Sequence, residues 1–263
     1  MDDSAAAGTP CRNCDAPLAP TDAYCPQCGQ KVAAHRLTLH EISHDLMHAL
    51  FHVDRSVLSL LRLLLTQPGR VARDYVAGKR KRYFGPFALL VIVVTLASAA
   101  LHLSGTQKFV FVPAGPAAMA AFVQEFLIKH ANLVYFIQVP LLAAACRALG
   151  VNGRFNYAEY LVLAAYTSSM RILFFTLAVI PLKFVAAGAS TTVVQLYVAY
   201  LSLWALYFGV AMAQFLGERR FLSAIKGIVA VILAQVLASL ILSALAQILI
   251  QLHFSAGPAV ANP

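Results

Sequence analysis

The chain has 263 residues, of which 60% are hydrophobic and 12% are charged, and its formal net charge is +9. Soluble domains are usually about half apolar and a quarter charged, so this composition excludes an ordinary soluble domain and indicates a polytopic membrane protein. The charges are unevenly distributed: residues 1–82 carry 11 basic and 8 acidic side chains, whereas the remaining 181 residues carry only 12 charges. We therefore expect a polar N-terminal third followed by an all-α transmembrane bundle.

Residues 1–10 are predicted to form a disordered tail, and residues 11–31 a small zinc ribbon. The ribbon is indicated by four cysteines with the spacing Cys11-x2-Cys14-x10-Cys25-x2-Cys28. Each pair can direct two thiolates at one metal ion, and four thiolates form the closed tetrahedral site typical of structural zinc. Iron in place of zinc, or a pair of disulfides, are the alternatives. Because thiolate ligands need a reducing compartment, we expect the N-terminus to be cytoplasmic.

Residues 36–83 are predicted to form cytoplasmic juxtamembrane helices, the first of which carries a histidine face. This helix begins with a capping box of Thr38 and Glu41 and runs to about Val53. Its apolar side chains fall within one narrow arc, and the opposite face carries four histidines at i, i+4 spacing: His40, His44, His48 and His52. These histidines could bind a metal weakly in pairs or titrate near pH 6.5, or they could simply form a solvated polar face.

The same helix contains the sequence HEISH, which fits the HExxH pattern of zinc metalloproteases. In that pattern two histidines bind zinc and the glutamate activates a bound water molecule, a role that His40, His44 and Glu41 could fill locally. A catalytic zinc needs a third protein ligand, and no recognisable motif downstream supplies one. We therefore expect no protease activity.

Two shorter helices and a basic cluster lead into the membrane. A largely apolar helix is predicted at 54–66 and a second one between Pro68-Gly69 and Gly78. The cluster that follows consists of Lys79, Arg80, Lys81 and Arg82. It can act as a topology signal, or it can contact anionic lipid or a protein partner, since each basic residue near an anionic leaflet contributes about 1 kcal/mol. Nucleic-acid binding is not expected, because no aromatic stacking platform accompanies these charges.

The bundle is predicted over residues 84–253, with a tail at 254–263. It contains five apolar segments that are long enough to cross a bilayer, at about 84–104, 132–149, 160–183, 192–216 and 222–252. Lysine and arginine are concentrated in the segments on the N-terminal side of the membrane, which places the N-terminus inside by the positive-inside rule. Five spans then place the C-terminus outside, in the periplasm.

One arginine, Arg171, lies within the third predicted span. An intramembrane arginine costs at least roughly 2.5–3.5 kcal/mol unless it is paired or hydrated, so it should face the bundle interior. It could pair with backbone carbonyls or with one of four glutamines, namely Gln138, Gln195, Gln214 and Gln235. Alternatively, it could hold an anion or a lipid headgroup. Glu159, three helical turns earlier, is too distant to pair with it and could lie at the inner mouth of the bundle.

Several of these motifs together resemble a bacterial family named domain of unknown function 3667. The resemblance is carried by CRNC, by YCPQCGQK, and by VDRSVLSLLRLLLTQPGRVARDYVAGKRKRYFGPF, which contains the family signature "Pg…Y..GkR..Y..P". NYAEYLVLAAY also resembles a family segment, in which Glu159 matches an acid while Tyr160 replaces a histidine. The resemblance implies an inner-membrane protein with an N-terminal zinc ribbon and several transmembrane helices, and it carries no activity over to this chain.

The sequence thus favours a non-enzymatic adaptor or regulator whose zinc ribbon docks a partner or controls the helical bundle. The main alternative is a transporter or channel that moves a small anionic or lipid-like substrate past Arg171. The expected cofactor is one structural zinc ion, and the expected partners are the lipid bilayer and a cytoplasmic or membrane protein.

Overall fold

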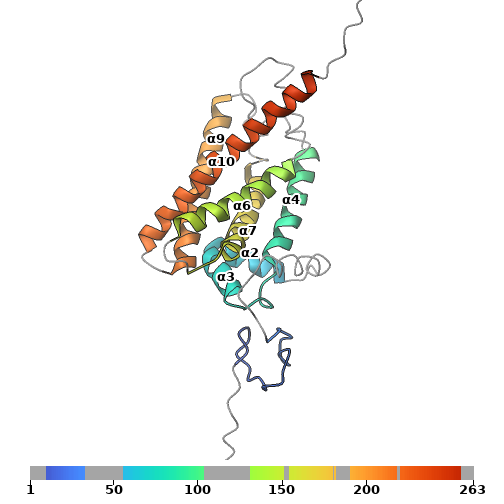
Figure 1. Cartoon of the computed structure of the whole chain (residues 1–263), viewed down its shortest axis with the longest axis vertical. Helices are drawn as coiled ribbons and strands as arrows, with labels where there is room; N and C mark the ends of the chain where they lie inside the picture. The colour runs from blue at the N-terminus through green and yellow to red at the C-terminus, as the bar shows by residue number, and fades with distance from the viewer. Residues whose placement is uncertain are drawn as a thin grey trace, which may run out of the picture.

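The computed structural model describes residues 10–32, 56–103, 131–150, 154–179, 181, 190–217 and 220–255. Within these ranges the protein is helical apart from a small N-terminal module, residues 10–32, which contains one antiparallel bridge between Tyr24 and Lys31 (Figure 1). We call it the four-cysteine module. The elements are α2 (Ser56–Thr66), α3 (Pro68–Val76), α4 (Pro86–Leu103), α6 (Ala131–Leu149), α7 (Tyr157–Phe174), the π-helical η2 (Phe175–Val179), α9 (Ser190–Leu216) and α10 (Arg220–Ser255).

Among the residues that the structure describes, four helical stretches are long and apolar enough to cross a membrane. They are Pro86–Leu103, Tyr157–Ala178, Val198–Leu216 and Phe221–Ile248, from α4, α7 with η2, α9 and α10. These stretches correspond to four of the five predicted spans and indicate a multi-pass membrane protein. The fifth predicted span corresponds to α6, whose apolar stretch, Tyr135–Leu149, is shorter. The structure therefore supports an all-α membrane fold without establishing the count of five.

The helices α2 and α3 form an elbow that packs against the end of α9. Pro68 begins α3, where its missing N–H costs no helical hydrogen bond. Gln214 of α9 holds the elbow in place through two hydrogen bonds. Its side-chain oxygen accepts from Gly69 N (3.0 Å), and its side-chain nitrogen donates to Thr66 O (3.1 Å). A Cβ on Gly69 would lie 1.9 Å from Ala211 O, so only glycine permits this close approach. The elbow is consequently part of the bundle.

The core of the bundle is centred on α7, most of which is buried. Its Tyr166 is fully buried, donates to Phe84 O (2.7 Å) and meets the Tyr75 ring edge-on at 5.9 Å between centroids. This one side chain thereby connects α7 to α3 and to the start of α4. The burial of α7 explains why its hydroxyls bond back to its own carbonyls, as Thr167 does to Leu163 O (2.7 Å).

The last two helices lie side by side in Figure 1 and meet through glycine. A Cβ on Gly227 would come within 2.9 Å of the Gly209 Cα, so α9 and α10 approach at backbone distance. Small residues are the usual means of close helix packing in membranes. Elsewhere along its length α10 exposes large apolar side chains: Ile232, Val236, Leu240 and Ile248. Such a face suits contact with lipid chains.

Candidate metal centre, basic turn and buried arginine

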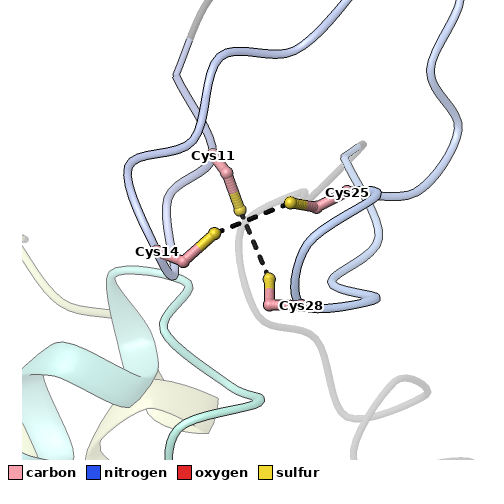
Figure 2. A group of neighbouring side chains, drawn as sticks. All are labelled: Cys11, Cys14, Cys25 and Cys28. Atoms are coloured by element: carbon pink, nitrogen blue, oxygen red, sulfur yellow. Dashed lines mark hydrogen bonds between the residues drawn. The ribbon is translucent and has the colours of Figure 1, made fainter.

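The four cysteines of the N-terminal module converge on one point (Figure 2). Their sulfur atoms all lie within 4.8 Å of one another, with Cys11 to Cys28 at 3.7 Å and Cys14 to Cys25 at 3.6 Å. All four are free thiols, so the structure does not contain the alternative pair of disulfides. The arrangement is a compact cluster of four sulfurs that could hold a metal ion.

Tight backbone turns aim the cysteines inward. After the first pair, Asp15 has φ +60° and donates from its N–H to Cys11 O (2.9 Å). After the second pair, Gly29 has φ +67° and donates to Cys25 O (2.9 Å). The left-handed conformation suits glycine and is tolerated by aspartate, which explains these residue types in the two turns. The two CxxC segments therefore form equivalent knuckles.

The sulfur distances fit a tetrahedral site. With metal–sulfur bonds of about 2.3 Å, the edge of a regular tetrahedron is about 3.8 Å. Two of the sulfur pairs, at 3.6 and 3.7 Å, are near this length. The donor set also fits, since four thiolates select zinc or iron over the hard cations. A metal ion would be held by all four cysteines, which leaves no open coordination position for catalysis.

The proximity of the thiols perturbs their acidity. At Cys14 the N–H of Ala16 lowers the pKa, but burial and the three neighbouring thiols outweigh it and raise the pKa to about 12. At Cys28 burial raises the pKa, but the N–H of Gln30, the side chain of Asn13 and two thiols together lower it to about 7. The opposite shifts at Cys14 and Cys28 show that these two thiols titrate as coupled groups. A cation bound at the cluster would favour their thiolate forms.

Two side chains beside the cysteines dock the module onto the chain just before α4. Gln30, which is 6% exposed, accepts from the backbone N–H of Lys81 (3.2 Å) through its side-chain oxygen. Asn13 likewise accepts from the backbone N–H of Arg82 (3.1 Å). Both residues also act on the Cys28 sulfur, Gln30 through its backbone N–H and Asn13 through its side chain. Gln30 and Asn13 each therefore link the four-cysteine cluster directly to the segment Lys79–Arg82.

That segment, Lys79–Arg82, is a turn between α3 and α4, and we call it the basic turn. It directly follows Gly78, whose φ of +108° helps to end α3. Lys79 forms an ion pair with Asp74 (3.3 Å), and Tyr83 donates to the other oxygen of the same carboxylate (3.0 Å). Of the four predicted contact residues, Lys79 is therefore engaged within the chain, whereas Lys81 and Arg82 are exposed.

A second polar group lies inside the bundle around Arg171, which is 7% exposed. Its Nη2 donates to Gln138 Oε1 on α6, and Gln138 Nε2 donates to Gln235 Oε1 on α10 (2.6 Å). Two of the four glutamines predicted as partners thus form a relay with it. The other two do not: Gln214 holds the α2–α3 elbow, and Gln195 is exposed.

Glu159 has a structural role at the start of α7. Its carboxylate accepts from Asn156 N (2.6 Å), and the Asn156 side chain accepts from Glu159 N (2.9 Å), which together form a capping box. The pattern Asn-x-x-Glu is visible in the sequence and predicts this arrangement. Arg171 and Glu159 are 12 residues apart on α7, about 18 Å along the axis, so they form separate sites.

The predicted histidine face and the HEISH motif lie outside the described residues. His40, His44, His48 and His52 therefore stay as sequence-based predictions. Other functional candidates were not predicted, namely Asn13, Gln30, Asp74, Tyr83 and Trp204. Asn13 and Gln30 flank cysteines, but no pattern in the sequence indicates that their amides reach a segment more than 50 residues away.

Residues 54–97 match the family described as "Protein of unknown function (DUF3667)", which confirms the resemblance over this part of the chain. The match runs from α2 through α4 and includes the basic turn. Comparison with curated proteins found no match, and comparison with solved structures found none either.

The structure gives a physical reason for the signature in the matched segment. Gly69 permits contact with α9, Gly78 ends α3 with positive φ, and Tyr83 bonds to Asp74. Four further signature positions begin or brace helices: Pro68, Tyr75, Lys79 and Pro86. The signature therefore describes an α3–turn–α4 clamp, which is the part of the bundle that contacts the four-cysteine module.

Proposed function

We propose that this protein is a non-enzymatic membrane regulator in which a metal-loaded four-cysteine module positions the basic turn at the entrance to the helical bundle. The observation that carries this proposal is the pair of amide contacts from Gln30 and Asn13 to the backbone of Lys81 and Arg82. Because both amides sit beside metal ligands, the state of the cysteine cluster sets the position of the turn and of α4 behind it.

Zinc is the metal we propose for the cluster. The support is the set of four thiolates, the tetrahedral sulfur spacing and the absence of an open position. Bound zinc would supply most of the free energy that orders so small a module, since its own apolar cluster contains little more than Ala16 and Leu18. Metal analysis of the purified protein distinguishes zinc from iron directly, and one ion per chain is expected.

The exposed side chains of Lys81 and Arg82 are the surface that we propose contacts anionic lipid or a protein partner. Their backbone is fixed by the module while their charged ends remain exposed. Phosphate headgroups at the cytoplasmic leaflet are the nearest anions to a turn that directly precedes a span. A protein partner could bind the module itself, where Tyr24 is 60% exposed.

We further propose five spans, with α6 as the fifth, in a bacterial inner membrane. The 19 residues of α6 give a length of about 28 Å, close to the hydrocarbon thickness of a bilayer. Basic residues gather at the end of the bundle that carries the module: Arg154 donates to Leu216 O (3.2 Å), and an Arg73 nitrogen lies beside Gly217. This end is then cytoplasmic by the positive-inside rule.

Hydrogen exchange at the amides of Lys81 and Arg82 tests the proposed coupling. Both amides should exchange slowly in the zinc-loaded protein, and zinc removal should speed them by about 5-fold or more, since a hydrogen bond contributes about 1 kcal/mol. Gln30→Ala should speed hydrogen exchange at the Lys81 amide even with zinc still bound, because it removes the acceptor of that N–H. Gln27→Ala is the matched control, because Gln27 lies in the same knuckle and is exposed.

The proposal is wrong if both amides exchange equally fast with and without zinc while the helical content of the bundle is unchanged. A different result would revive a protease: two zinc ions per chain, one of them lost in His40→Ala/His44→Ala. A single ion that is insensitive to His44→Ala supports a purely structural metal.

A further inference from the structure

The surroundings of Arg171 have more hydrogen-bond donors than acceptors. Its guanidinium group donates to Gln138, lies over the Trp204 ring with 4.4 Å from Cζ to the ring centroid, and lies 5.9 Å from that of Tyr135. The Gln138 oxygen is used by this bond, and the Gln235 oxygen is used by Gln138. The side-chain oxygens of the relay are therefore already engaged.

The positive charge of Arg171 also has no counter-ion in the described part of the chain. No ion pair is formed there by Arg171, and Glu159 on the same helix is about 18 Å away. A buried cation in an apolar bundle is normally paired or functional. The aromatic rings on two sides attract the cation but do not neutralise it.

Two buried N–H groups at this place are left without an acceptor. Among the described residues, neither Arg171 Nε nor Trp204 Nε1 meets a hydrogen-bond partner, although the two side chains are 7% and 4% exposed. Buried donors are rarely left in this state, and two on adjacent side chains are less common still. The group that completes this site must accept hydrogen bonds and carry negative charge.

The backbone next to Arg171 is also irregular. Only four residues after it, α7 changes into the π-helical segment η2, Phe175–Val179. Single π-helical turns within α-helices occur frequently at functional sites. This irregularity is independent of the unpaired donors and lies at the same level of the bundle.

We propose that Arg171 and Trp204 form a binding site for an oxyanion, a phosphate or carboxylate group, inside the bundle. The planar guanidinium group offers parallel N–H donors that match two oxygens of such a group, and the indole N–H supplies a further donor. The oxyanion can come from a lipid headgroup or from a free solute. The site is formed by α6, α7 and α9 and does not depend on the four-cysteine module.

Thermal unfolding of the purified full chain in a neutral detergent tests this site with two probes. The first probe is inorganic phosphate, compared with chloride at equal ionic strength. The second is phosphatidylglycerol in mixed micelles, compared with phosphatidylcholine. A ligand that binds only the folded state raises Tm, and we expect a rise of several degrees with at least one probe. A rise with phosphate indicates a free solute, and a rise with phosphatidylglycerol alone indicates a lipid headgroup.

Trp204→Phe is the variant that separates a binding role from a structural one. It keeps an aromatic ring beside Arg171 and removes the unpaired N–H, but the smaller side chain leaves a cavity at a buried position. Without a probe Tm should therefore fall modestly, and binding is judged from the probe-dependent rise above that baseline. The apparent affinity for the probe should weaken by roughly 10- to 100-fold, as expected for one lost charge-assisted hydrogen bond. Arg171→Lys keeps the charge but removes the planar donors and should weaken binding as well.

Two control variants test whether the probe-dependent rise in Tm comes from the Arg171–Trp204 site. Arg147→Gln removes an exposed arginine of α6 and should leave the probe-dependent rise intact. Lys81→Gln/Arg82→Gln should also leave it intact, which separates this site from the basic turn. The proposal is overturned if neither probe raises Tm, or if the rise is the same in Trp204→Phe as in the unmodified protein.

Discussion

At the scale of single residues, the buried polar side chains of the bundle are of two kinds. Some have their hydrogen bonds satisfied, and others have a donor without an acceptor among the described residues. Glu159 is 4% exposed, yet its carboxylate accepts a backbone N–H and its own N–H is capped by Asn156. Arg171 is buried to a similar degree, but one of its nitrogens has no acceptor in the described part of the chain. Burial alone therefore does not identify a functional residue, and the hydrogen-bond partners do.

Asn156→Ala should destabilise the protein by about 1 kcal/mol, because the start of α7 loses its cap. Glu159→Gln should be nearly neutral, since glutamine serves at the same position of a capping box. Thermal unfolding of both variants in detergent checks these expectations. If Glu159→Gln were as destabilising as Asn156→Ala, or if it abolished a measurable proton or metal response, Glu159 would have a role beyond the cap.

At the scale of helices and turns, the α3–turn–α4 clamp connects the module to the bundle. Asp74 is its central residue, because one oxygen meets Lys79 and the other accepts from Tyr83. Tyr166 of α7 also stabilises the clamp, because its hydroxyl donates a hydrogen bond to Phe84 O. A shift of the basic turn would therefore be transmitted to the first candidate span.

The clamp should also respond to alkaline pH. Burial raises the pKa of Tyr83 above its usual 10.0, and the hydrogen bond and charge of Asp74 add to this, while Arg82 opposes it. A raised pKa in the folded state favours the neutral phenol, so its stabilisation is fully present below pH 10 and is lost as pH rises through the raised value. Tyr83→Phe should thus lower stability by about 1 kcal/mol near neutral pH.

Tm measured against pH for both proteins tests this expectation. The difference between the unmodified protein and Tyr83→Phe should be constant from neutral pH to about pH 9 and should shrink above about pH 10. Tyr24→Phe is the control, because it removes the same hydroxyl from a tyrosine that is 60% exposed. A difference that grew with pH would contradict the assigned direction.

At the scale of the whole molecule, the position of α6 decides the topology. Four spans leave both chain ends on the same side of the membrane, whereas five place them on opposite sides. The helix α6 packs against both α7 and α10, which are candidate spans, and its Gln138 joins them through the relay. This position in the bundle supports a span.

Reporter fusions distinguish the two topologies. With five spans, a fluorescent protein fused to the N-terminus should fluoresce in the bacterial cytoplasm, and alkaline phosphatase fused to the C-terminus should be active in the periplasm. An inactive phosphatase at the C-terminus, together with fluorescence of the same fusion site, would indicate four spans. Reversing the charges of Lys81 and Arg82 should weaken the orientation bias.

The features that the sequence alone determined are those governed by local chemistry. Spacing indicated that four cysteines converge in a cluster that could hold a metal ion, hydrophobic length marked the membrane helices, and Pro68 and Gly78 marked the bounds of α3. Each depends on residues close together in the chain, where periodicity and backbone preference dominate. Local patterns also indicated that Arg171 must be buried among polar side chains.

The partners of those side chains were decided only by the tertiary structure. Gln30 meets Lys81 across 51 positions, Gln138 meets Gln235 across 97, and Gly69 meets Gln214 across 145. No pattern within one helix encodes such pairs, because they arise when packing brings separate helices within hydrogen-bond distance. The same packing left two donors at Arg171 and Trp204 unmatched. The sequence therefore determined the positions of the polar residues along the helices, and the fold determined which of their donors and acceptors are paired.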